Sequence, residues 1–250
     1  MNEVIQTIMA RKSIRAFEPR EIEPEQKGAI LQAALRAPTA GNMSLYTILD
    51  ITDQSLKERL SETCDHQPFI GRAPMVLVFC VDYYRWYHCF RRLESEDYPV
   101  RKPDMGDFLL AFEDVMAAAQ TAVLAAESLG IGSCYIGDIL ENYEIHQELL
   151  KLPQYVAPVS MLVFGYPMPG QAKRKQTPRF RLEDMVHENG YCAERADRMY
   201  EMIKEREGKA EEEMEDYLRA FCTRKWNSDF SVEMSRSANR ILEAWKRIQL

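Results

Sequence analysis

The stretch "DFLLAFEDVMAAAQTAVLAAESL", residues 107–129, does most to decide the fold. Its apolar residues recur at helical spacing, and Gly130 follows where a helix commonly ends in a left-handed residue. Only Asp107, Glu113, Asp114 and Glu127 are charged, so the predicted helix is apolar nearly all round. We therefore expect a core helix that is covered on several sides, and a subunit interface is one way to cover it.

The segments around this helix predict a mixture of helices and strands. The runs "LYTILDI" (45–51), "MVLVFCVD" (75–82) and "APVSMLVFGYP" (157–167) are typical of strands, and "GIGSCYIGD" (130–138) of a short strand. Helical patterns occupy 22–38, 53–64 and 142–153. Regular βαβ repeats and a GxGxxG turn are both missing, which argues against a Rossmann domain and for an α+β fold.

Composition and charge narrow the function. The net charge of −7 disfavours nucleic acid and anionic membranes as partners. The uncharged run 115–126 is shorter than a membrane-spanning helix, and no secretory leader opens the sequence, so we expect a cytoplasmic protein without a membrane segment. The six cysteines lie far apart and do not suggest disulfides or a metal site. The spacing of the four histidines does not suggest a metal site or hydrolase chemistry either.

The C-terminal part has a different composition. Residues 194–216 carry ten acids and five bases, which is typical of a solvated helical segment, and "ILEAWKRI" (241–248) predicts a second, amphipathic helix. Neither segment is expected to fold alone. We therefore predict one domain over residues 1–250, with 190–250 as an arm that docks on the main domain or on a neighbouring subunit.

Two basic clusters without acids stand out in this acidic chain. In "RKSIRAF" (11–17), an extended backbone would place Arg11, Ser13 and Arg15 on one face, and two guanidinium groups with a hydroxyl suit a phosphate. The second cluster is "QAKRKQTPRFR" (171–181). A phosphate monoester bound between the clusters is our preferred interpretation, and solvated basic patches are the alternative.

Two small-residue loops are further candidates for ligand binding. The loop "RAPTAGNMSLY" (36–46) offers polar side chains and a glycine that permits close backbone approach, and it either borders a flat heterocycle or simply connects a helix to a strand. The glycines of "SLGIGSCYIGD" (128–138) allow either a ligand or tight strand packing.

Taken together, these stretches resemble the FMN-dependent nitroreductase family, in particular its oxygen-insensitive nitroreductases and NAD(P)H:flavin oxidoreductases. The resemblance runs in order through "RKSIRAF", "HQPFIGRAPMVLVFCVD", "AAQTAVLAAESLGIGSCYIGDI", "LLKLPQYVAPVSMLVFGYP", "TPRF" and "MVHENGY". It implies a nitroreductase-like α+β fold with a central, mostly antiparallel sheet surrounded by helices. It also implies an intertwined homodimer that holds FMN at two sites, each built from both subunits.

The resemblance also assigns residues to the cofactor. The FMN phosphate would be held by Arg11, Ser13 and Arg15 and, from the second cluster, by Arg179 and Lys175, or Lys173, because Thr177 stands where the family has a lysine. The residues expected near the flavin ring are Pro38, Thr39, Ala40 and Asn42 over the isoalloxazine, Gln67 at its pyrimidine end, Tyr135 and Ile136 beside it, and the Gly137 amide at N5. The longer segment 86–106 is expected to shape the substrate mouth.

The implied function is an FMN-dependent oxidoreductase that transfers hydride from NAD(P)H through flavin N5 to nitroaromatics, quinones or free flavin by a ping-pong mechanism. The flavin does the chemistry, so no catalytic side chain and no metal are expected. Arg195, Arg198 and Arg206 are candidates for contacting an NADPH 2′-phosphate, although a charged helical face explains them as well. The alternative function is a flavin-binding protein with a structural or sensing role.

Overall fold

The computed structural model describes residues 1–246 in two compact units. The first unit comprises Met1–Arg174 together with the chain from Glu233 onward, and the second comprises Lys175–Val232. Each unit is described by itself below. The single domain over 1–250 with an arm from 190 stays a prediction, and the last residues of the predicted helix 241–248 lie outside the described residues.

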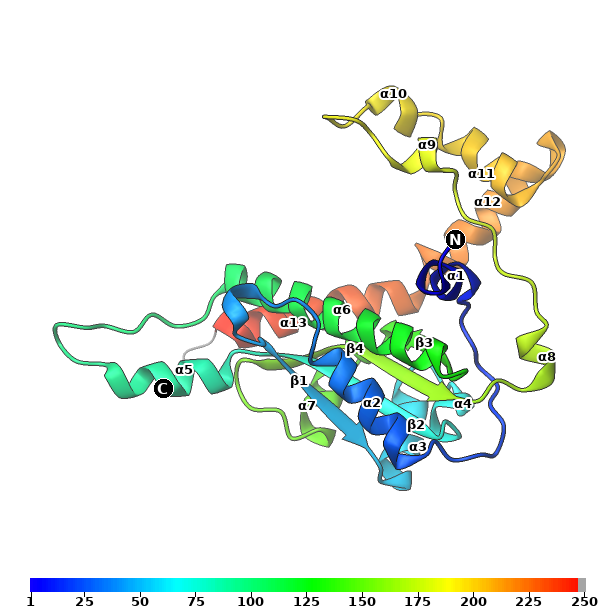
Figure 1. Cartoon of the computed structure of the whole chain (residues 1–250). Helices are drawn as coiled ribbons and strands as arrows, with labels where there is room; N and C mark the ends of the chain where they lie inside the picture. The colour runs from blue at the N-terminus through cyan, green and yellow to red at the C-terminus, as the bar shows by residue number, and fades with distance from the viewer. Residues whose placement is uncertain (247–250) are drawn as a thin grey trace. The chain divides into compact units, whose positions relative to one another are not determined.

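A four-stranded antiparallel sheet forms the centre of the first unit (Figure 1). Its strands are β1 (Tyr46–Ile51), β2 (Met75–Asp82), β3 (Gly132–Ile136) and β4 (Val156–Gly165), in the order β1-β2-β4-β3. All neighbouring strands pair antiparallel. The sequence placed all four strands correctly, and the expectation of an α+β fold with a mostly antiparallel sheet is confirmed.

The central strand β2 is buried on both faces, as its continuous apolar sequence predicts. Because side chains alternate along a strand, Leu77 and Phe79 belong to one hydrophobic cluster and Val76 and Val78 to the other. The helices packed on the first face are α2 (Pro24–Ala34), α6 (Met105–Ser128) and the part of α13 (Asp229–Lys246) that begins at Glu233. The helices packed on the second face are α3 (Gln54–Thr63), α4 (Pro68–Gly71) and the short 3-10 helix η3 (Gly137–Leu140).

The long helix α6 lies where the sequence predicts it. Asp104 caps its N-terminus by accepting a bond from the Met105 amide, and Gly130 beyond its end has φ of 73°, the left-handed conformation expected there. Among the described residues α6 is the one helix long and apolar enough to cross a membrane, by length and composition only. Its buried apolar residues, including Val115 and Ala122, belong to the first cluster, which accounts for that composition.

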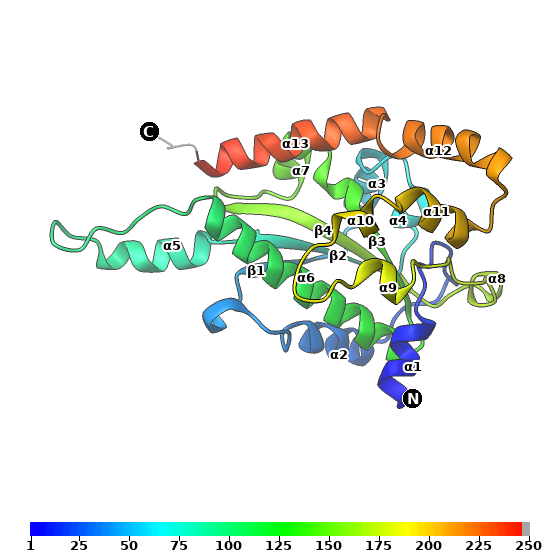
Figure 2. The ribbon, with the colours of Figure 1, turned by 90° about the horizontal axis from the view of Figure 1, so that it is seen from above.

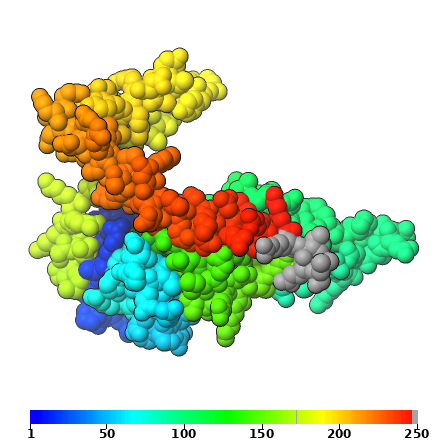
Figure 3. All heavy atoms as spheres, turned by 180° about the vertical axis from the view of Figure 1, so that it is seen from behind, coloured from blue at the N-terminus to red at the C-terminus, as the bar shows by residue number. Residues whose placement is uncertain are grey.

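The remaining elements of the first unit are shorter. They are α1 (Glu3–Ala10), the 3-10 helix η1 (Ala40–Asn42), α5 (Tyr84–Phe90), the 3-10 helix η2 (Arg91–Leu93), α7 (Tyr143–Leu149) and α8 (Pro169–Ala172). Figure 3 shows α13 in red along the green segment that includes α7. Arg236 on α13 pairs with Glu144 on α7 at 2.9 Å, and Ser237 accepts a bond of 3.1 Å from the first amide of α7, at Tyr143. These contacts fix α13 on the core.

All secondary-structure elements described in the second unit are helices. These are α9 (Leu182–Met185), α10 (Ala193–Ala196), α11 (Met199–Glu207), α12 (Glu211–Lys225) and the first residues of α13. Gly208, with φ of 63°, ends α11 and separates it from α12. The predicted acidic helical segment 194–216 therefore contains most of α10, all of α11 and the start of α12, and Gly208 separates the last two.

Candidate functional site

The first basic cluster lies along the edge strand β3. Ser13 forms a parallel bridge with Ser133, and the Ile14 amide donates a 2.9 Å hydrogen bond to the Ser133 carbonyl. Ile14 is buried, whereas Arg15 is exposed, which is the alternation expected of an extended segment. A Cβ added at Gly132 would lie 2.5 Å from Ile14 Cγ1, so the glycine lets the two segments approach.

Further cations join this cluster from the chain after β4. Lys12 Nζ donates to the Arg174 carbonyl at 2.8 Å, and the Arg174 guanidinium donates to the Ser13 carbonyl at 3.0 Å. Arg174 was not among the predicted site residues, although it lies in the basic run 171–181. Burial raises the pKa of the Cys134 thiol, and the charge of Arg15 opposes that rise, which shows that Arg15 lies close to β3.

The donors gathered here fit a phosphate group. Guanidinium groups and a hydroxyl offer several hydrogen bonds to an anion, and Arg15 and Arg174 form no ion pair with a carboxylate among the described residues. Ser133 is fully buried, and its Oγ has no hydrogen-bond partner in the described part of the chain. The capacity to bind an anion therefore lies with Arg15 and Arg174, because the enclosed Ser133 hydroxyl is out of reach of a ligand at the surface.

The end of β3 presents backbone more than side chains. The Tyr135 hydroxyl donates to Gln120 Oε1 at 3.2 Å, and burial raises its pKa to about 12, against the opposing charge of Arg11. The Ile136 side chain packs in the second cluster, so only its backbone can face a ligand. Gly137 is exposed, and a Cβ added there would meet nothing within 4 Å. A flat ring could approach the backbone at Gly137 without obstruction.

Gln67 lies near the end of β3. It occupies the N-cap position of α4, and its side-chain amide donates to the Cys64 carbonyl at 2.9 Å. Burial raises the pKa of the Cys64 thiol, and the neighbouring charge of Asp138 adds to the rise, so this turn and the start of η3 are close together. Arg11, Ser13, Arg15, Gln67 and residues 135–137 thus share one region around β3, which we call the β3 group.

The loop 38–45 is held by a carboxylate that sequence reasoning missed. Asp114 on α6 is buried, and its side chain accepts bonds from the Thr39 hydroxyl, from the Ala40 amide at 2.9 Å and from the Leu45 amide at 3.1 Å. The Thr39 oxygen in turn accepts a 2.7 Å bond from the Ser44 amide. In the sequence, Asp114 is only one of four charges on an apolar helix, and nothing there points to the loop.

The loop 38–45 is fixed near the middle of α6, at Asp114, whereas Ser13 pairs with the start of β3, just beyond the end of the helix at Ser128. Asp114 and Ser128 are roughly 21 Å apart along the helix axis. In Figures 1 and 2 the chain between α2 and β1 lies toward α5, and α1 lies at the opposite end of α6. One chain therefore does not bring all the predicted ring and phosphate residues together.

The segment 86–106 forms one wall of a cavity beside the loop 38–45. The cavity has a volume of about 400 Å³ and is lined by Met43, Tyr83, Trp86, Tyr87, Phe90, Val100, Arg101, Pro103, Asp107 and Leu110. The Trp86 indole donates to the Met43 carbonyl at 2.7 Å, which ties the segment to the loop. Arg101 forms an ion pair with Asp107 at its edge. The expected role of the segment 86–106 in shaping the substrate mouth stays a prediction.

The second unit contains Lys175 and Arg179, two predicted phosphate ligands. Both are exposed, and the Arg179 guanidinium donates to Thr177 Oγ1 at 2.9 Å. Their part in a phosphate site stays a prediction. Two of the arginines proposed for a 2′-phosphate have structural contacts: Arg206 stacks over Phe180 at 4.2 Å, and Arg195 donates to two backbone carbonyls.

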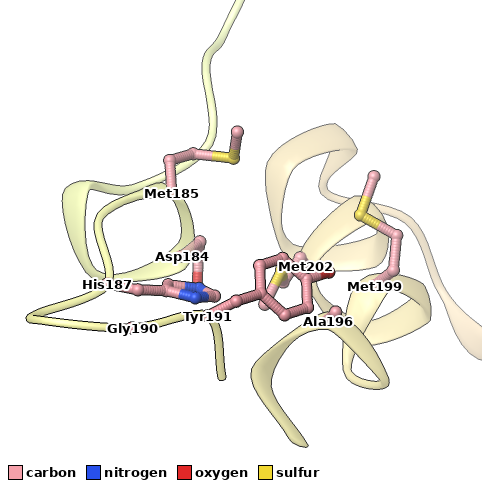
Figure 4. Close-up of a pocket in the computed structure, with 8 residues that line it drawn as sticks. All are labelled: Asp184, Met185, His187, Gly190, Tyr191, Ala196, Met199 and Met202. Atoms are coloured by element: carbon pink, nitrogen blue, oxygen red, sulfur yellow. The ribbon is translucent and has the colours of Figure 1, made fainter. Parts of the chain in front are cut away.

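The second unit also has a pocket of its own (Figure 4). Its volume is about 680 Å³, and it is lined by Asp184, Met185, His187, Gly190, Tyr191, Ala196, Met199 and Met202. The His187 ring lies 5.3 Å from that of Tyr191, and its Nδ1 accepts a bond from the Cys192 amide. Within the described residues, no group of three or more His, Cys, Asp or Glu side chains is placed to hold a metal ion.

Comparisons with known proteins find relatives that match most of the chain. The FMN reductase [NAD(P)H] of Bacillus subtilis (strain 168) is 32% identical over 236 residues, which cover 94% of this chain and 92% of the relative. The structure of nitroreductase A from Vibrio parahaemolyticus superposes with a TM-score of 0.78 at 27% identity, covering 97% of this chain and 98% of that one. The NADPH:FMN oxidoreductase from Vibrio harveyi, solved with NAD+, gives 0.75 at 27% identity and covers 96% and 98%.

A family model gives the most general result. The model described as the nitroreductase family matches residues 8–166, a range that contains both the β3 group and the loop 38–45. The resemblance read from the sequence is thereby confirmed, and so is the nitroreductase-like fold. This chain belongs to the nitroreductase family.

Proposed function

We propose that this protein is an NAD(P)H-dependent flavin oxidoreductase that holds FMN between two copies of the chain. The observation that carries the proposal is the family match over residues 8–166, which includes a built cationic cluster at β3. The named relatives, an FMN reductase and an NADPH:FMN oxidoreductase, support the same cofactor and electron donor. The cytoplasmic location expected from the sequence is part of this proposal.

The β3 group would hold the phosphate and one edge of the ring. Arg11, Arg15 and the Ser13 hydroxyl donate to the phosphate oxygens, and Arg174 adds charge beside them. The open backbone at Gly137 admits the ring edge, and the Gln67 amide bonds its pyrimidine end. When bound, FMN supplies the redox chemistry, taking hydride from NAD(P)H and passing electrons to a nitroaromatic, quinone or free flavin. The residues contribute position and charge, and donor and acceptor use one site in turn.

A homodimer would supply the missing part of each site. Asp114, which fixes the loop 38–45, is roughly 21 Å along α6 from Ser128, beyond which the phosphate ligands pair with β3, so we place the loop of a second copy over the ring. Apolar side chains exposed on α1 and α6 support such a contact: Val4 is 64% exposed, Met9 62% and Leu109 58%. Buried in a dimer, this surface would complete the covering expected for α6.

Spectroscopy and size measurement test the proposal. We expect the purified protein to show a flavin absorption spectrum or to take up added FMN, to be a dimer by light scattering, and to be bleached rapidly by NADPH or NADH without oxygen. Initial rates at several donor and acceptor concentrations should give the parallel double-reciprocal lines of a ping-pong mechanism. A protein that binds FMN but is bleached slowly would favour a structural or sensing role. A colourless protein that refuses FMN would contradict the proposal.

A further inference from the structure

The buried carboxylate of Asp114 is a feature that flavin binding at β3 does not use. Asp114 is 4% exposed, halfway along an apolar helix. No lysine, arginine or histidine in the described part of the chain forms an ion pair with it. A buried charge is costly unless hydrogen bonds compensate for it, so the three donors of the loop 38–45 are what make this carboxylate tolerable.

The loop depends equally on the carboxylate. Gly41, Asn42 and Ser44 all have positive φ, at 55°, 58° and 51°. In the two non-glycine residues this backbone conformation is strained and costs free energy. Such a conformation persists where the surroundings fix it. Asp114 fixes both ends, because it binds the Ala40 amide at the start and the Leu45 amide at the end, and Thr39 Oγ1 closes the turn through the Ser44 amide.

We propose that Asp114 is a positioning residue for the flavin: it holds the loop 38–45 in the one conformation that fits against the isoalloxazine ring, without touching the cofactor itself. The inference rests on the proposed function, since the ring is what the loop would meet. It assigns the Thr39 side chain to the loop's own structure, because its hydroxyl already donates to Asp114 and accepts from Ser44. Gly41 and Asn42, which are exposed, are then the surface presented to the ring.

Asp114→Asn with Glu113→Gln as the matched control tests the inference. Both changes remove one negative charge from α6, but Glu113 is exposed and makes no bond to the loop. An asparagine amide would place NH₂ donors against the loop's own donors. In FMN-free protein, hydrogen exchange at the Ala40 and Leu45 amides should become about tenfold faster or more in Asp114→Asn and stay unchanged in Glu113→Gln.

FMN titration is the second measurement on the same proteins. The dissociation constant should rise about tenfold or more in Asp114→Asn, and the visible spectrum of the bound flavin should shift, because the ring loses its neighbour while the phosphate site is intact. If Asp114→Asn fails to fold, Thr39→Val and Thr39→Ser replace it. The valine removes the hydroxyl and should show both effects, and the serine keeps it and should show neither.

The outcomes separate this inference from the proposed function. Faster exchange in the loop together with weaker FMN binding supports the inference. Unchanged exchange, or faster exchange with wild-type FMN affinity and spectrum, would overturn it. If wild-type protein itself refuses FMN, the proposed function fails and the flavin role fails with it, whereas the exchange data still show whether Asp114 orders the loop.

Discussion

Replacing Gly132 by alanine is the change whose effect the structure predicts most directly. The added Cβ would lie 2.5 Å from Ile14 Cγ1 and 3.0 Å from Pro167 Cγ. Carbon atoms pack at about 3.5–4.0 Å, so Ile14 has to retreat by about 1 Å or more. Ile14 is only 2% exposed and carries Ser13 and Arg15 on either side. Its displacement therefore moves two predicted phosphate ligands.

The size of the effect follows from the costs of overpacking. An extra methyl group in a packed core typically costs about 1–3 kcal/mol. At about 2–4 °C per kcal/mol for a chain of this size, Gly132→Ala should lower the melting temperature of FMN-free protein by about 4–8 °C for a mid-range cost. Gly137→Ala is the matched control for stability, because its Cβ would meet nothing within 4 Å and the melting temperature should not fall.

Melting of both variants at one protein concentration, followed by FMN titration, completes the test. Fixed concentration matters because a dimer melts in a concentration-dependent way. Gly132→Ala should also bind FMN less tightly than wild type. A variant with wild-type stability and wild-type FMN affinity would show that Ile14 does not fix the cationic cluster, and the reasoning would be wrong.

Three further predictions concern single side chains. Arg15→Ala should weaken FMN binding about ten- to hundredfold, by the loss of a charged hydrogen bond, and should leave riboflavin binding unchanged, as parallel titrations would reveal. Burial, together with the charges of Asp138, Asp65 and Glu233, raises the pKa of Glu141 to about 7, so between about pH 4.5 and 7 the folded protein holds a proton that the unfolded protein has released. The free energy of unfolding should therefore fall as the pH rises through this range. In urea unfolding, Glu141→Gln should be more stable than wild type at pH 8, and its stability should depend less on pH. Arg206→Ala should leave the ratio of NADPH to NADH rates in stopped flow unchanged, because Arg206 already stacks on Phe180 and pairs with Glu207; a loss confined to NADPH would contradict this.

The sequence predicted the elements whose pattern is local. The segment 75–82 has no alternating pattern, because β2 is buried on both faces, but its continuous apolar run of strand-forming residues was enough to predict the strand. Gly130 in turn marked the end of α6. The sequence predicts an apolar strand between Pro158 and Pro167, whereas β4 begins at Val156 and includes Pro158. The proline is tolerated at an irregularity where Phe79 pairs with Ser160 and Cys80 with Pro158.

The arrangement of the site was less predictable. Three contacts of Asp114 join residues about seventy positions apart, and no local pattern encodes them. Arg174 lies in the predicted basic run 171–181, but which of the adjacent basic residues reaches Ser13 depends on where the backbone turns after α8. The separation of the loop 38–45 from β3 likewise follows from the length and direction of α6, which only the fold determines.

Mixed dimers test the central claim, that each FMN site takes its phosphate ligands from one chain and its ring loop from the other. One chain carries Arg15→Ala, and the other carries Gly41→Val, which puts a β-branched residue at a φ of 55°. Differently tagged chains are co-expressed, and only dimers that retain both tags are purified. Each homodimer should be deficient in FMN, whereas the mixed dimer has one site with both defects and one with none, so it should recover half of the wild-type FMN content. A mixed dimer as deficient as the two homodimers would mean that each chain builds its site alone, and the account of a shared site would be wrong.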